Sequence, residues 1–393
     1  MASIEKRSKN SFRLIVEAGY DELGKRVKRY KTVNVSGIRE AEKELVKFRS
    51  EVESGQYVVP QKISFSIFVE KWTELYGEKH LEQKTLENYE HLLKNHILPI
   101  FGSMKMTDVK PMHILSFLDS LTRNGARKDG KNGGLSTTTT RFIHRVLKDI
   151  FERAVEWQII SSNPVSAVKR PKIKERESEV YDEQEASKLF QALENEPIHW
   201  RIMVTLALTT GMRRGELLAL EWKHIDFDSS VIQVAQSLSH SKGVNIIKEP
   251  KTKNSKRRVS IPDSLIKELQ HYYEKSKTMK QQLGDMWQGG ERFVVFFSET
   301  GKPFYHTAPG KWLSRFIKRN NFKPIRFHDL RHTSATLLIN QGVHAKIIAS
   351  RLGHADIRTT MNVYGHVLQS ADQAAANTFN SLLNNITFFK SKN

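Results

Sequence analysis

Two arginines, two histidines and a tyrosine in the second half of the chain could together carry out one reaction. They are Arg213 in T-T-G-M-R-R-G-E, His328 and Arg331 in F-H-D-L-R-H-T, His354 in L-G-H-A-D-I-R-T-T and Tyr364 in M-N-V-Y-G-H. A tyrosine can act as a nucleophile, and cations can neutralise the charge that develops on phosphorus oxygens in a transition state. These residue types suit in-line attack on a phosphodiester without a metal ion.

Each group has a physical role that it can fill in such a reaction. The guanidinium groups of Arg213 and Arg331 offer planar forks that match phosphate oxygens and stay charged at any working pH. His354 can donate a further hydrogen bond to the same phosphate. The phenol of Tyr364, with an ordinary pKa of about 10, needs a proton acceptor during attack, and His328 is the candidate base.

The composition indicates a soluble globular chain and points to a polyanionic partner, with a merely soluble basic protein as the alternative. Hydrophobic residues make up 38% and charged residues 27% of the 393 positions, and no run approaches the ~20 apolar residues of a membrane span. The net charge of +20, with an excess of Lys and Arg in each part of the chain, makes nucleic acid the first candidate partner.

The chain has no cysteine, which excludes disulfides, thiolate metal sites and cysteine nucleophiles and fits a reducing compartment. The first residues lack the apolar core of a secretory signal. We therefore expect a protein of the bacterial cytoplasm, without membrane association. We also expect no cofactor and no metal, and the absence of a G-x-x-x-x-G-K-[ST] motif agrees with a reaction that needs no ATP.

Three successive parts would position the chemical residues, so the chain is predicted to be a multidomain α+β protein. The first part, residues 1–58, is predicted to hold a three-stranded sheet and one helix. Alternation in S-F-R-L-I-V-E-A predicts one strand, and K-R-V-K-R-Y-K-T-V-N-V predicts an intensely basic return strand. A sheet of this kind could read DNA, and a minor α+β cap is the structural alternative.

The second part, residues 61–171, is predicted to be an all-α domain of four helices. Its apolar residues recur at intervals of three and four. Ser136 or Thr137 is expected to cap the last and longest helix. The helix ends and the basic, glycine-rich loop at 123–131 would be natural contacts for phosphates.

The third part, residues 175–393, is predicted to be mainly helical with a small antiparallel sheet. Two helices should flank a turn centred on Gly211, because glycine favours the end of a helix. The segment 225–262 is strand-rich: V-I-Q-V-A-Q-S-L alternates, and N-I-I-K-E-P-K-T-K-N-S-K-R-R-V-S-I-P is expected to form strand, turn and strand. V-V-F-F at 294–297 is expected to be a further strand.

Taken together, the motifs resemble those of the tyrosine recombinases, the phage-integrase family. The resemblance is carried by T-G-M-R-R-G-E-L-L-A-L, K-T-K-N-S-K-R-R-V, H-D-L-R-H-T, and L-G-H followed ten residues later by a tyrosine. Their order and spacing are highly specific, although any one of them alone would be weak. The helical middle also matches the family in style, and the first part is similar to the arm-site-binding domains of integrases of phages and conjugative transposons.

The resemblance implies roles for individual residues. Arg213, Arg331 and His354 would bind the phosphate, His328 would handle protons and Tyr364 would attack. Glu216, three positions after the first arginine, matches the acidic residue that supports it, since residues three apart share a helix face. The family's general acid is a lysine on a hairpin. Lys251 fits best, while Lys253 and Lys256 are close enough to remain alternatives.

The resemblance further implies a site-specific recombinase that integrates and excises a mobile element through a 3′-phosphotyrosyl intermediate and a Holliday junction. Its partners would be double-stranded attachment sites of core and arm type, with an excisionase and a host DNA-bending protein as candidate accessory factors. The segment after Tyr364 predicts an amphipathic helix. In the family such a tail docks on a neighbouring subunit, which implies a homotetramer on DNA; packing on its own domain is the alternative.

Two other functions fit parts of this pattern. A type IB topoisomerase shares the chemistry but rejoins the same strand, and the N-terminal module argues against it. A non-catalytic DNA-binding regulator could use the same scaffold, but the intact set of arginines, histidines and tyrosine argues against such decay.

Overall fold

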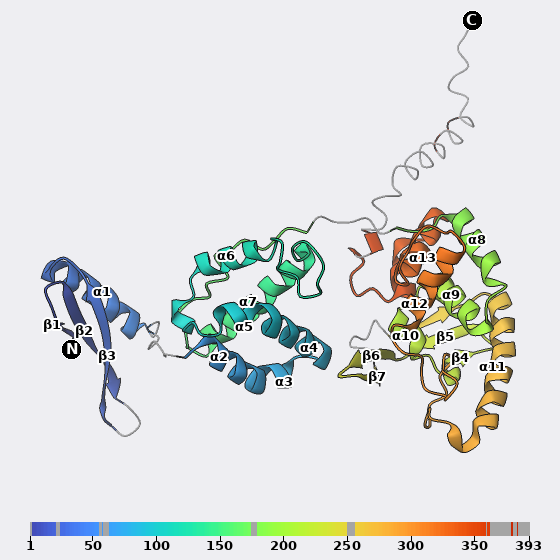
Figure 1. Ribbon diagram of the computed structural model, residues 1–393, viewed down its shortest axis with the longest axis horizontal. Coiled ribbons are helices and arrows are strands. Elements are labelled where there is room, and N and C mark those ends of the chain that lie inside the picture. Colours follow the sequence, from blue (N-terminus) through green and yellow to red (C-terminus); the bar gives the residue numbers. More distant parts are fainter. Residues whose placement is uncertain are drawn as a thin grey trace, which may run out of the picture. The chain divides into compact units, whose positions relative to one another are not determined.

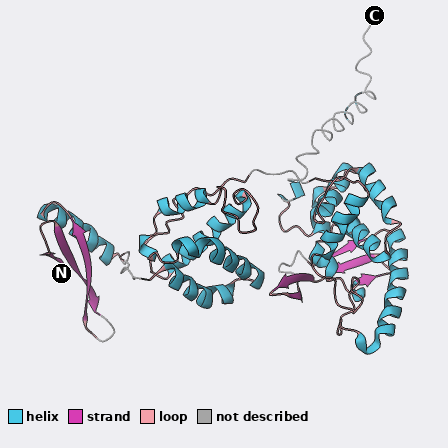
Figure 2. Cartoon of the chain, in the orientation of Figure 1, coloured by secondary structure: helices cyan, strands magenta, loops and turns pink. Residues whose placement is uncertain are grey.

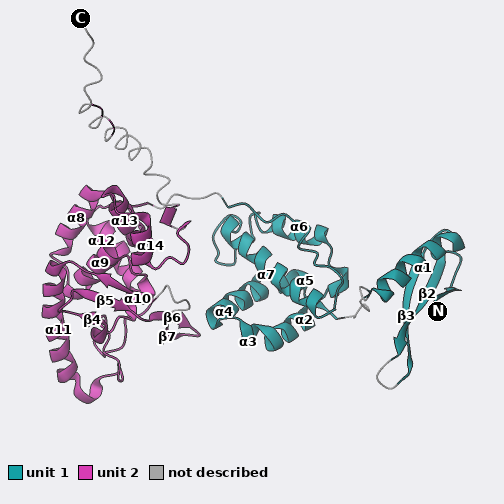
Figure 3. Ribbon diagram, turned by 180° about the vertical axis from the view of Figure 1, so that it is seen from behind, with its two compact units in different colours: residues 1–175 teal, residues 176–393 magenta. Residues whose placement is uncertain are grey.

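The computed structural model describes residues 2–20, 24–54, 57, 63–173, 179–249, 256–358, 360–361, 379 and 383. Its chain divides into two compact units, Met1–Glu175 and Arg176–Asn393 (Figure 3). Helices predominate in the described residues of both units, and the strands are short apart from those near the N-terminus (Figures 1 and 2). None of the described helices is both long enough and apolar enough to cross a membrane.

The N-terminal part of unit 1 is a three-stranded antiparallel sheet covered by one helix, which confirms the predicted architecture. The strands β1 (Ala2–Lys6), β2 (Ser11–Tyr20) and β3 (Arg26–Asn34) pair in the order β1-β2-β3. Sequence alternation identified the second and third strands but not β1. The helix α1 (Ile38–Glu53) packs on one face of the sheet (Figure 1).

The two faces of this sheet differ in chemistry because side chains alternate along a strand. The covered face supplies Phe12, Leu14 and Val16, which are buried against Ala41 and Phe48 of α1. The uncovered face carries a set that we call the basic face: Arg13, Arg26, Lys28 and Tyr30. Within it the guanidinium carbon of Arg13 lies 4.2 Å from the centre of the Tyr30 ring. The basic strand predicted from sequence therefore exposes one face.

The second part of unit 1 is helical, as predicted. The elements are α2 (Phe65–Trp72), a π-helical turn (Thr73–Gly77), α3 (Glu78–His80), α4 (Gln83–Leu92), a second π-helical turn (Leu93–Ile97), α5 (Leu98–Phe101), a 3-10 turn (Met106–Asp108), α6 (Pro111–Ser120) and α7 (Thr137–Glu156). Because the two π-helical turns are continuous with their neighbours, the helices make up the four expected helical stretches. Ser136 caps α7, its hydroxyl accepting from the backbone N–H of Thr139 at 3.1 Å.

Unit 2 is mainly helical, and its predicted chemical residues within the described part lie on helices or next to helix ends. Its helices are α8 (Glu183–Leu193), α9 (Ile198–Thr210), α10 (Arg214–Leu218), α11 (Asp263–Leu283), α12 (Ala308–Arg319), α13 (Asp329–Asn340) and α14 (Ala345–Leu352), with 3-10 turns at Trp222–His224 and Gly284–Met286. Helix α13 packs against both α9 and α14. Buried side chains such as Leu206, Phe316 and Leu330 join these helices into the core.

The strand-rich segment of unit 2 forms two small sheets. Strands β4 (Ile225–Asp226), β5 (Val231–Val234) and β8 (Arg257–Ser260) make one sheet in the order β4-β5-β8, while β6 (Ser237–Ser241) pairs only with β7 (Val244–Lys248) in the described residues. The alternating run expected as one strand is thus split into β5 and β6.

The expected strand, turn and strand at 245–262 is correct for the strands but wrong if read as a hairpin, because β7 and β8 belong to different sheets. Strand β8 pairs with β5, which places Val259 opposite Ile232, and both are buried. Strand β7 turns back on β6 through Lys242 and Gly243, whose φ angles of 46° and 80° suit a tight hairpin turn. Alternation predicts strands but does not predict their partners.

The strand expected at 294–297 is also wrong. Residues Val294, Val295 and Phe296 are buried, which explains the apolar run. However, only isolated bridges form among the described residues, from Val294 to Glu221 and from Phe297 to Pro303. A short continuous apolar run is consistent with a buried strand, but it is equally consistent with buried extended backbone outside a ladder.

Candidate active site

The turn after α9 places the first predicted arginine. Gly211 ends α9 with a φ of 63°, and a Cβ atom there would lie 2.1 Å from Leu352 of α14, so the position needs glycine. Arg213 follows as the residue that precedes α10. Its Nη2 donates to the carbonyl oxygen of Gly353 at 3.1 Å. The turn therefore brings Arg213 against the end of α14, 140 residues further along the chain.

Glu216 supports Arg213 in the way that the three-residue spacing predicts. Its Oε2 accepts from the Arg213 backbone N–H at 2.8 Å, and its Oε1 accepts from Arg213 Nη1 at 2.9 Å. The Glu216 side chain is 4% exposed, whereas that of Arg213 is 39% exposed. Burial acts to raise the pKa of Glu216, but the hydrogen bonds and charges of Arg257 and then Arg213 outweigh it and lower the pKa. Glu216 is thus a buried carboxylate that holds an accessible arginine.

Arg331 is the second predicted arginine, and it lies on α13 with only 4% of its surface exposed. Its Nη1 donates to the carbonyl oxygen of Gly211 at 2.6 Å. Its Nη2 is also buried and has no hydrogen-bond partner among the described residues. Burial first, and then the charge of Arg213, lower the pKa of Arg331 to about 9. An unsatisfied buried N–H of a cation is costly, and an anionic oxygen would satisfy it.

His328 precedes α13 and lines a cavity of about 620 Å³. The same cavity is lined by Arg213, Arg214, Gly215, Gly310, Ser314, Ile325, Arg326 and Phe327. His328 is exposed as a residue, and its ring centre lies 5.1 Å from that of His332. Partial burial, then His332 and then Arg331, lower the pKa of His328 to about 4. At neutral pH the imidazole is uncharged and can accept a proton.

His354 follows Gly353, which ends α14 with a φ of 69°. Its Nδ1 lies 2.7 Å from the hydroxyl oxygen of the buried Thr360. Burial, then the charges of Arg331 and Arg213, lower the pKa of His354 to about 4. A neutral imidazole whose Nδ1 accepts from the hydroxyl carries its proton on Nε2. In that tautomer His354 can donate its Nε2–H to an anion near the two arginines whose charges act on it.

Four predicted residues thus come together, and we call Arg213, His328, Arg331 and His354 the arginine–histidine cluster. They come from three separate segments, near α10, on α13 and after α14. The charges of both arginines help to lower the pKa of each histidine. Within the described part of the chain, the positive charge of the two arginines in the cluster is larger than the negative charge of Glu216. An arrangement of preorganised donors and uncompensated cations of this kind stabilises developing negative charge on a bound phosphate.

Two predicted residues, Lys251 and Tyr364, lie outside the described residues, as does the alternative Lys253. Lys256, the other alternative, is described: its Nζ lies 2.8 Å from Glu249 and its side chain is 53% exposed. The segment expected to form an amphipathic tail helix, with Phe379, Leu382, Leu383 and Ile386 on one side, also lies outside, except for Phe379 and Leu383, which are exposed. The roles of the lysine, the tyrosine and the tail stay predictions.

Sequence reasoning missed two arginines next to the site, one bound to Glu216 and the other to backbone carbonyls around it. Arg257 places Nη1 at 3.2 Å from Glu216 Oε1 and Nη2 at 2.9 Å from Oε2. Arg351 donates from Nη2 to the carbonyl oxygens of Thr209 and Ser260 at 2.7 and 2.8 Å. Both stand in motifs already quoted or next to them, K-R-R-V and R-L-G-H. A basic residue in a half-buried strand or next to a helix-ending glycine was the available signal.

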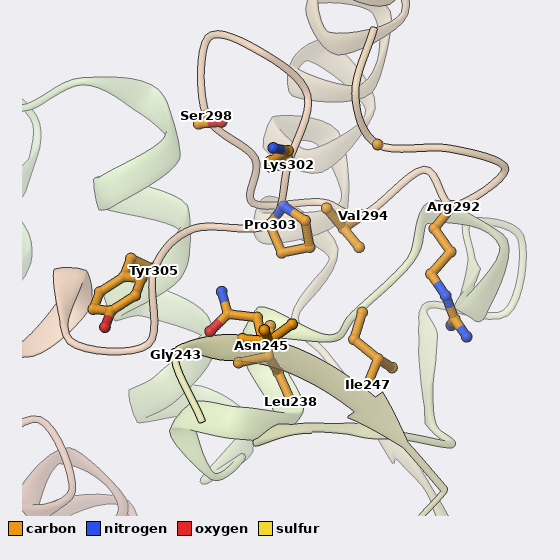
Figure 4. A pocket seen from close by; sticks show the side chains of 12 residues that line it. Leu238, Gly243, Asn245, Ile247, Arg292, Val294, Ser298, Lys302, Pro303 and Tyr305 are labelled. Carbon is orange, nitrogen blue, oxygen red and sulfur yellow. The ribbon is translucent and has the colours of Figure 1, made fainter. Parts of the chain in front are cut away.

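Unit 2 has a second cavity, of about 630 Å³, whose lining residues differ from those of the cluster. Its walls are the β6–β7 hairpin, with Leu238, Asn245 and Ile247, and the 289–305 segment, with Pro303 and Tyr305 (Figure 4). It includes no residue of the arginine–histidine cluster. Among the described residues, no three His, Asp or Glu side chains lie together in a way that could hold a metal ion.

Comparison with known proteins supports the resemblance. Residues 179–371 match the model described as "Phage integrase family", and residues 64–122 match "Phage integrase, N-terminal SAM-like domain". The chain is 28% identical to the ICEBs1 integrase of Bacillus subtilis over 97% of this chain and all of that protein. It is 29% identical to a "Tyrosine recombinase XerC-like" protein of Caldanaerobacter subterraneus, over 96% of this chain and 97% of that protein.

Solved structures share the fold. The Tn1549 transposon integrase in complex with transposon right end DNA has a TM-score of 0.66 and 22% identity, covering 80% of this chain and 99% of that chain. A lambda integrase tetramer bound to a Holliday junction has a TM-score of 0.54 and 21% identity, covering 92% and 94%. The two matching family models, together with the relatives matched over nearly their whole length, show that the chain belongs to the phage-integrase family of tyrosine recombinases.

Proposed function

We propose that this tyrosine recombinase cleaves and rejoins DNA with Tyr364 as nucleophile, and that the arginine–histidine cluster binds the scissile phosphate. The Nη2 of Arg331, buried and without a partner among the described residues, carries this proposal. It lies in a cluster where Arg213 and the Nε2 side of His354 can also meet an anion. The exposed fraction of Arg213, 39%, lets a phosphate reach the cluster from the side of the cavity lined by His328.

The proposed reaction conserves the phosphodiester. The Tyr364 oxygen attacks phosphorus while His328 accepts the phenolic proton, and the 5′-oxygen leaves with a proton from a general acid, for which Lys251 is our candidate. The product is a 3′-phosphotyrosyl bond and a free 5′-hydroxyl. A 5′-hydroxyl of another strand can reverse the step, so exchange needs no ATP. The two arginines and His354 hold the phosphorus oxygens throughout.

The three predicted parts would divide DNA recognition between them. Residues 1–58 would bind arm sites through the basic face, residues 61–171 would bind the core site, and residues 175–393 would cleave it. The net charge of +20 supports contact along an extended polyanion. We further propose a homotetramer on DNA that integrates and excises a mobile element in the bacterial cytoplasm. An excisionase and a host DNA-bending protein are candidate accessory factors.

Covalent capture on randomised DNA tests the chemistry and lets the protein select its own site. Nicked duplexes with a randomised core would be incubated with the full chain, and DNA attached to denatured protein would be sequenced. We expect enrichment of one core sequence and a peptide map that places the adduct on Tyr364. Tyr364→Phe should give no adduct, and an adduct formed by this variant would contradict the nucleophile assignment.

The same preparation separates the proposal from its rival. Supercoiled DNA with and without the captured core sequence would be treated in parallel. We expect strand exchange between two captured sites and little change in DNA that lacks them. Efficient relaxation of DNA without the captured site would instead favour a topoisomerase of type IB.

A further inference from the structure

Arg257 opens strand β8 and points into the protein. Its side chain is 5% exposed, whereas that of its neighbour Arg258 is 70% exposed. Successive side chains of a strand point to opposite faces, so two adjacent arginines meet opposite surroundings. A buried arginine needs partners for its charge and its donors. The partners of Arg257 lie in the active site, although the residue is neither a predicted catalyst nor open to a substrate.

The first partner of Arg257 is Glu216. Two nitrogens of Arg257 face its two carboxylate oxygens, at 3.2 Å for Nη1 to Oε1 and 2.9 Å for Nη2 to Oε2. A fork-to-fork pair of this kind fixes the plane of a carboxylate as well as its position. The same two oxygens accept from Arg213, through Nη1 and the backbone N–H. Glu216 is therefore held between a buried arginine on one side and the exposed, substrate-facing arginine on the other.

The charges explain why this arrangement needs a second arginine. A carboxylate paired with Arg213 alone would cancel much of the attraction of that guanidinium for a phosphate. Arg257 shares the carboxylate, so Arg213 keeps a net positive field while its orientation is still fixed. Among the described residues of this site, one carboxylate, Glu216, interacts with the charges of three arginines: Arg213, Arg257 and Arg331. Burial and then the charge of Arg213 lower the pKa of Arg331 to about 9.

The second partner of Arg257 is the end of α14. Its Nε donates to the carbonyl oxygen of Arg351 at 2.7 Å. In return, Arg351 donates from Nη2 to the carbonyl oxygen of Ser260, at the other end of β8, at 2.8 Å. A Cβ atom on Gly353 would lie 2.9 Å from Arg257 Nη1, so the two residues are in close approach. Gly353 also accepts from Arg213 and directly precedes His354.

We propose that Arg257 is a positioning residue of the recombination reaction. It aligns Arg213 through Glu216 and aligns His354 through the backbone of residues 351–353, and it does not touch DNA. It also begins the strand that follows, in sequence, the segment bearing Lys251. Arg257 would thereby connect Arg213 and His354 to the strand that follows Lys251, the candidate general acid, in sequence. The inference rests on the proposed phosphoryl transfer at this site.

The test compares Arg257→Ala and Arg257→Lys with Arg258→Ala as the matched control on the same strand. The probe is the nicked duplex captured by the wild-type chain, and single-turnover adduct formation and duplex affinity are both measured. For Arg257→Ala we expect cleavage to fall by about 10–100-fold, the scale seen when a supporting partner is removed. We expect its affinity for the duplex to change by less than about threefold, since the side chain is buried from DNA. Arg258→Ala should cleave like the wild type.

A double-mutant cycle with Glu216→Gln distinguishes positioning from general destabilisation. If Arg257 acts through Glu216, the two losses in cleavage rate overlap, and the double variant should cleave about as fast as the slower single variant. If the losses multiply, Arg257 does not act through Glu216 and the inference is overturned. Should Arg257→Ala fail to fold by circular dichroism, the same cycle is run with Arg257→Lys, which keeps the charge but loses the fork.

The remaining outcomes are equally decisive. Wild-type adduct formation with unimpaired Arg257 variants would overturn the inference and leave the proposed function intact. Equal losses of affinity and cleavage would also overturn it, because they would indicate a DNA contact. A wild-type chain that forms no adduct on any nicked duplex would contradict the proposed function itself.

Discussion

The basic face of the N-terminal sheet and the arginine–histidine cluster use similar residues under opposite physical conditions. On the sheet, Arg26, Lys28 and Tyr30 are exposed, so water solvates the charges and salt screens them. In the cluster, Arg331 is 4% exposed and donates to a backbone carbonyl. Arg213 donates to the buried carboxylate of Glu216. The first arrangement costs little to fold, whereas the second is costly unless it is paired.

This difference separates attraction from alignment. Exposed cations attract a phosphate backbone in many registers, because this attraction does not depend on sequence and does not by itself require one geometry. The cluster's arginines are held in place, Arg213 by Glu216 and Gly353 and the buried Arg331 by Gly211, so they can meet only a phosphate that arrives in one place. Changes on the sheet should therefore alter affinity and its salt dependence, and changes in the cluster should alter cleavage and stability.

The largest effect is expected on folding stability when the shared carboxylate is removed. Glu216→Ala would leave Arg213, Arg257 and Arg331 without their buried counter-charge, and breaking a buried ion pair costs about 3–5 kcal/mol. Urea unfolding followed by circular dichroism measures the loss. Inorganic phosphate or duplex DNA should restore part of it by supplying an anion to the same arginines. A variant as stable as the wild type would show that the cluster tolerates its charge unpaired.

The next effect is expected on catalysis. Arg331→Lys keeps the charge but removes the fork, so it should lower single-turnover cleavage of the captured duplex by about 10²–10³-fold, the cost of losing one preorganised donor. Its affinity for the duplex should stay near that of the wild type. Arg315→Lys, at an exposed arginine of α12, serves as the control. A loss of DNA affinity without a loss of cleavage rate would mean that Arg331 only attracts DNA, as we expect of the basic face.

A smaller effect is expected from pH. The folded pKa of His354 is lowered from 6.5 to about 4, so between these values the unfolded chain binds more protons than the folded chain. The contribution to stability is present above pH 6.5 and is lost as the pH falls toward 4. His354→Asn, which cannot take up that proton, should lose less stability than the wild type between pH 7 and pH 4.5 in urea unfolding. Parallel pH profiles would contradict the lowered pKa.

The smallest effect is expected on the sheet. Lys28→Ala should weaken binding to duplex DNA selected on the full chain by a few-fold and reduce the slope of log K against log salt by about one. Cleavage of a duplex that holds only the core site should not change. Arg39→Ala, an exposed arginine on the helix that covers the other face, is the control. Equal slopes for both variants would show that the basic face does not meet phosphates.

Local patterns predicted much of this molecule because they report local physics. Alternation identified β2 and β3, the Ser136 cap started α7, and Gly211 ended α9. The pairing of Arg213 with Glu216 followed from a spacing of one helical turn. Prediction stopped where a segment's partner lies elsewhere: the strands expected at 245–262 form, but β7 and β8 belong to different sheets, and the buried run at 294–297, expected to be a strand, is not one.

The sequence alone determined the chemical types available to the site, their order along the chain and the family motifs that contain them. Tertiary structure decided which of these groups meet and which donors stay open. Arg213 reaches Gly353 across 140 residues, and Arg257 reaches Glu216 across 41. No periodicity spans such distances, because they are set by how α9, α13, α14 and β8 pack against one another. That packing buries Arg257, and it leaves one nitrogen of Arg331 without a partner among the residues that the structure describes.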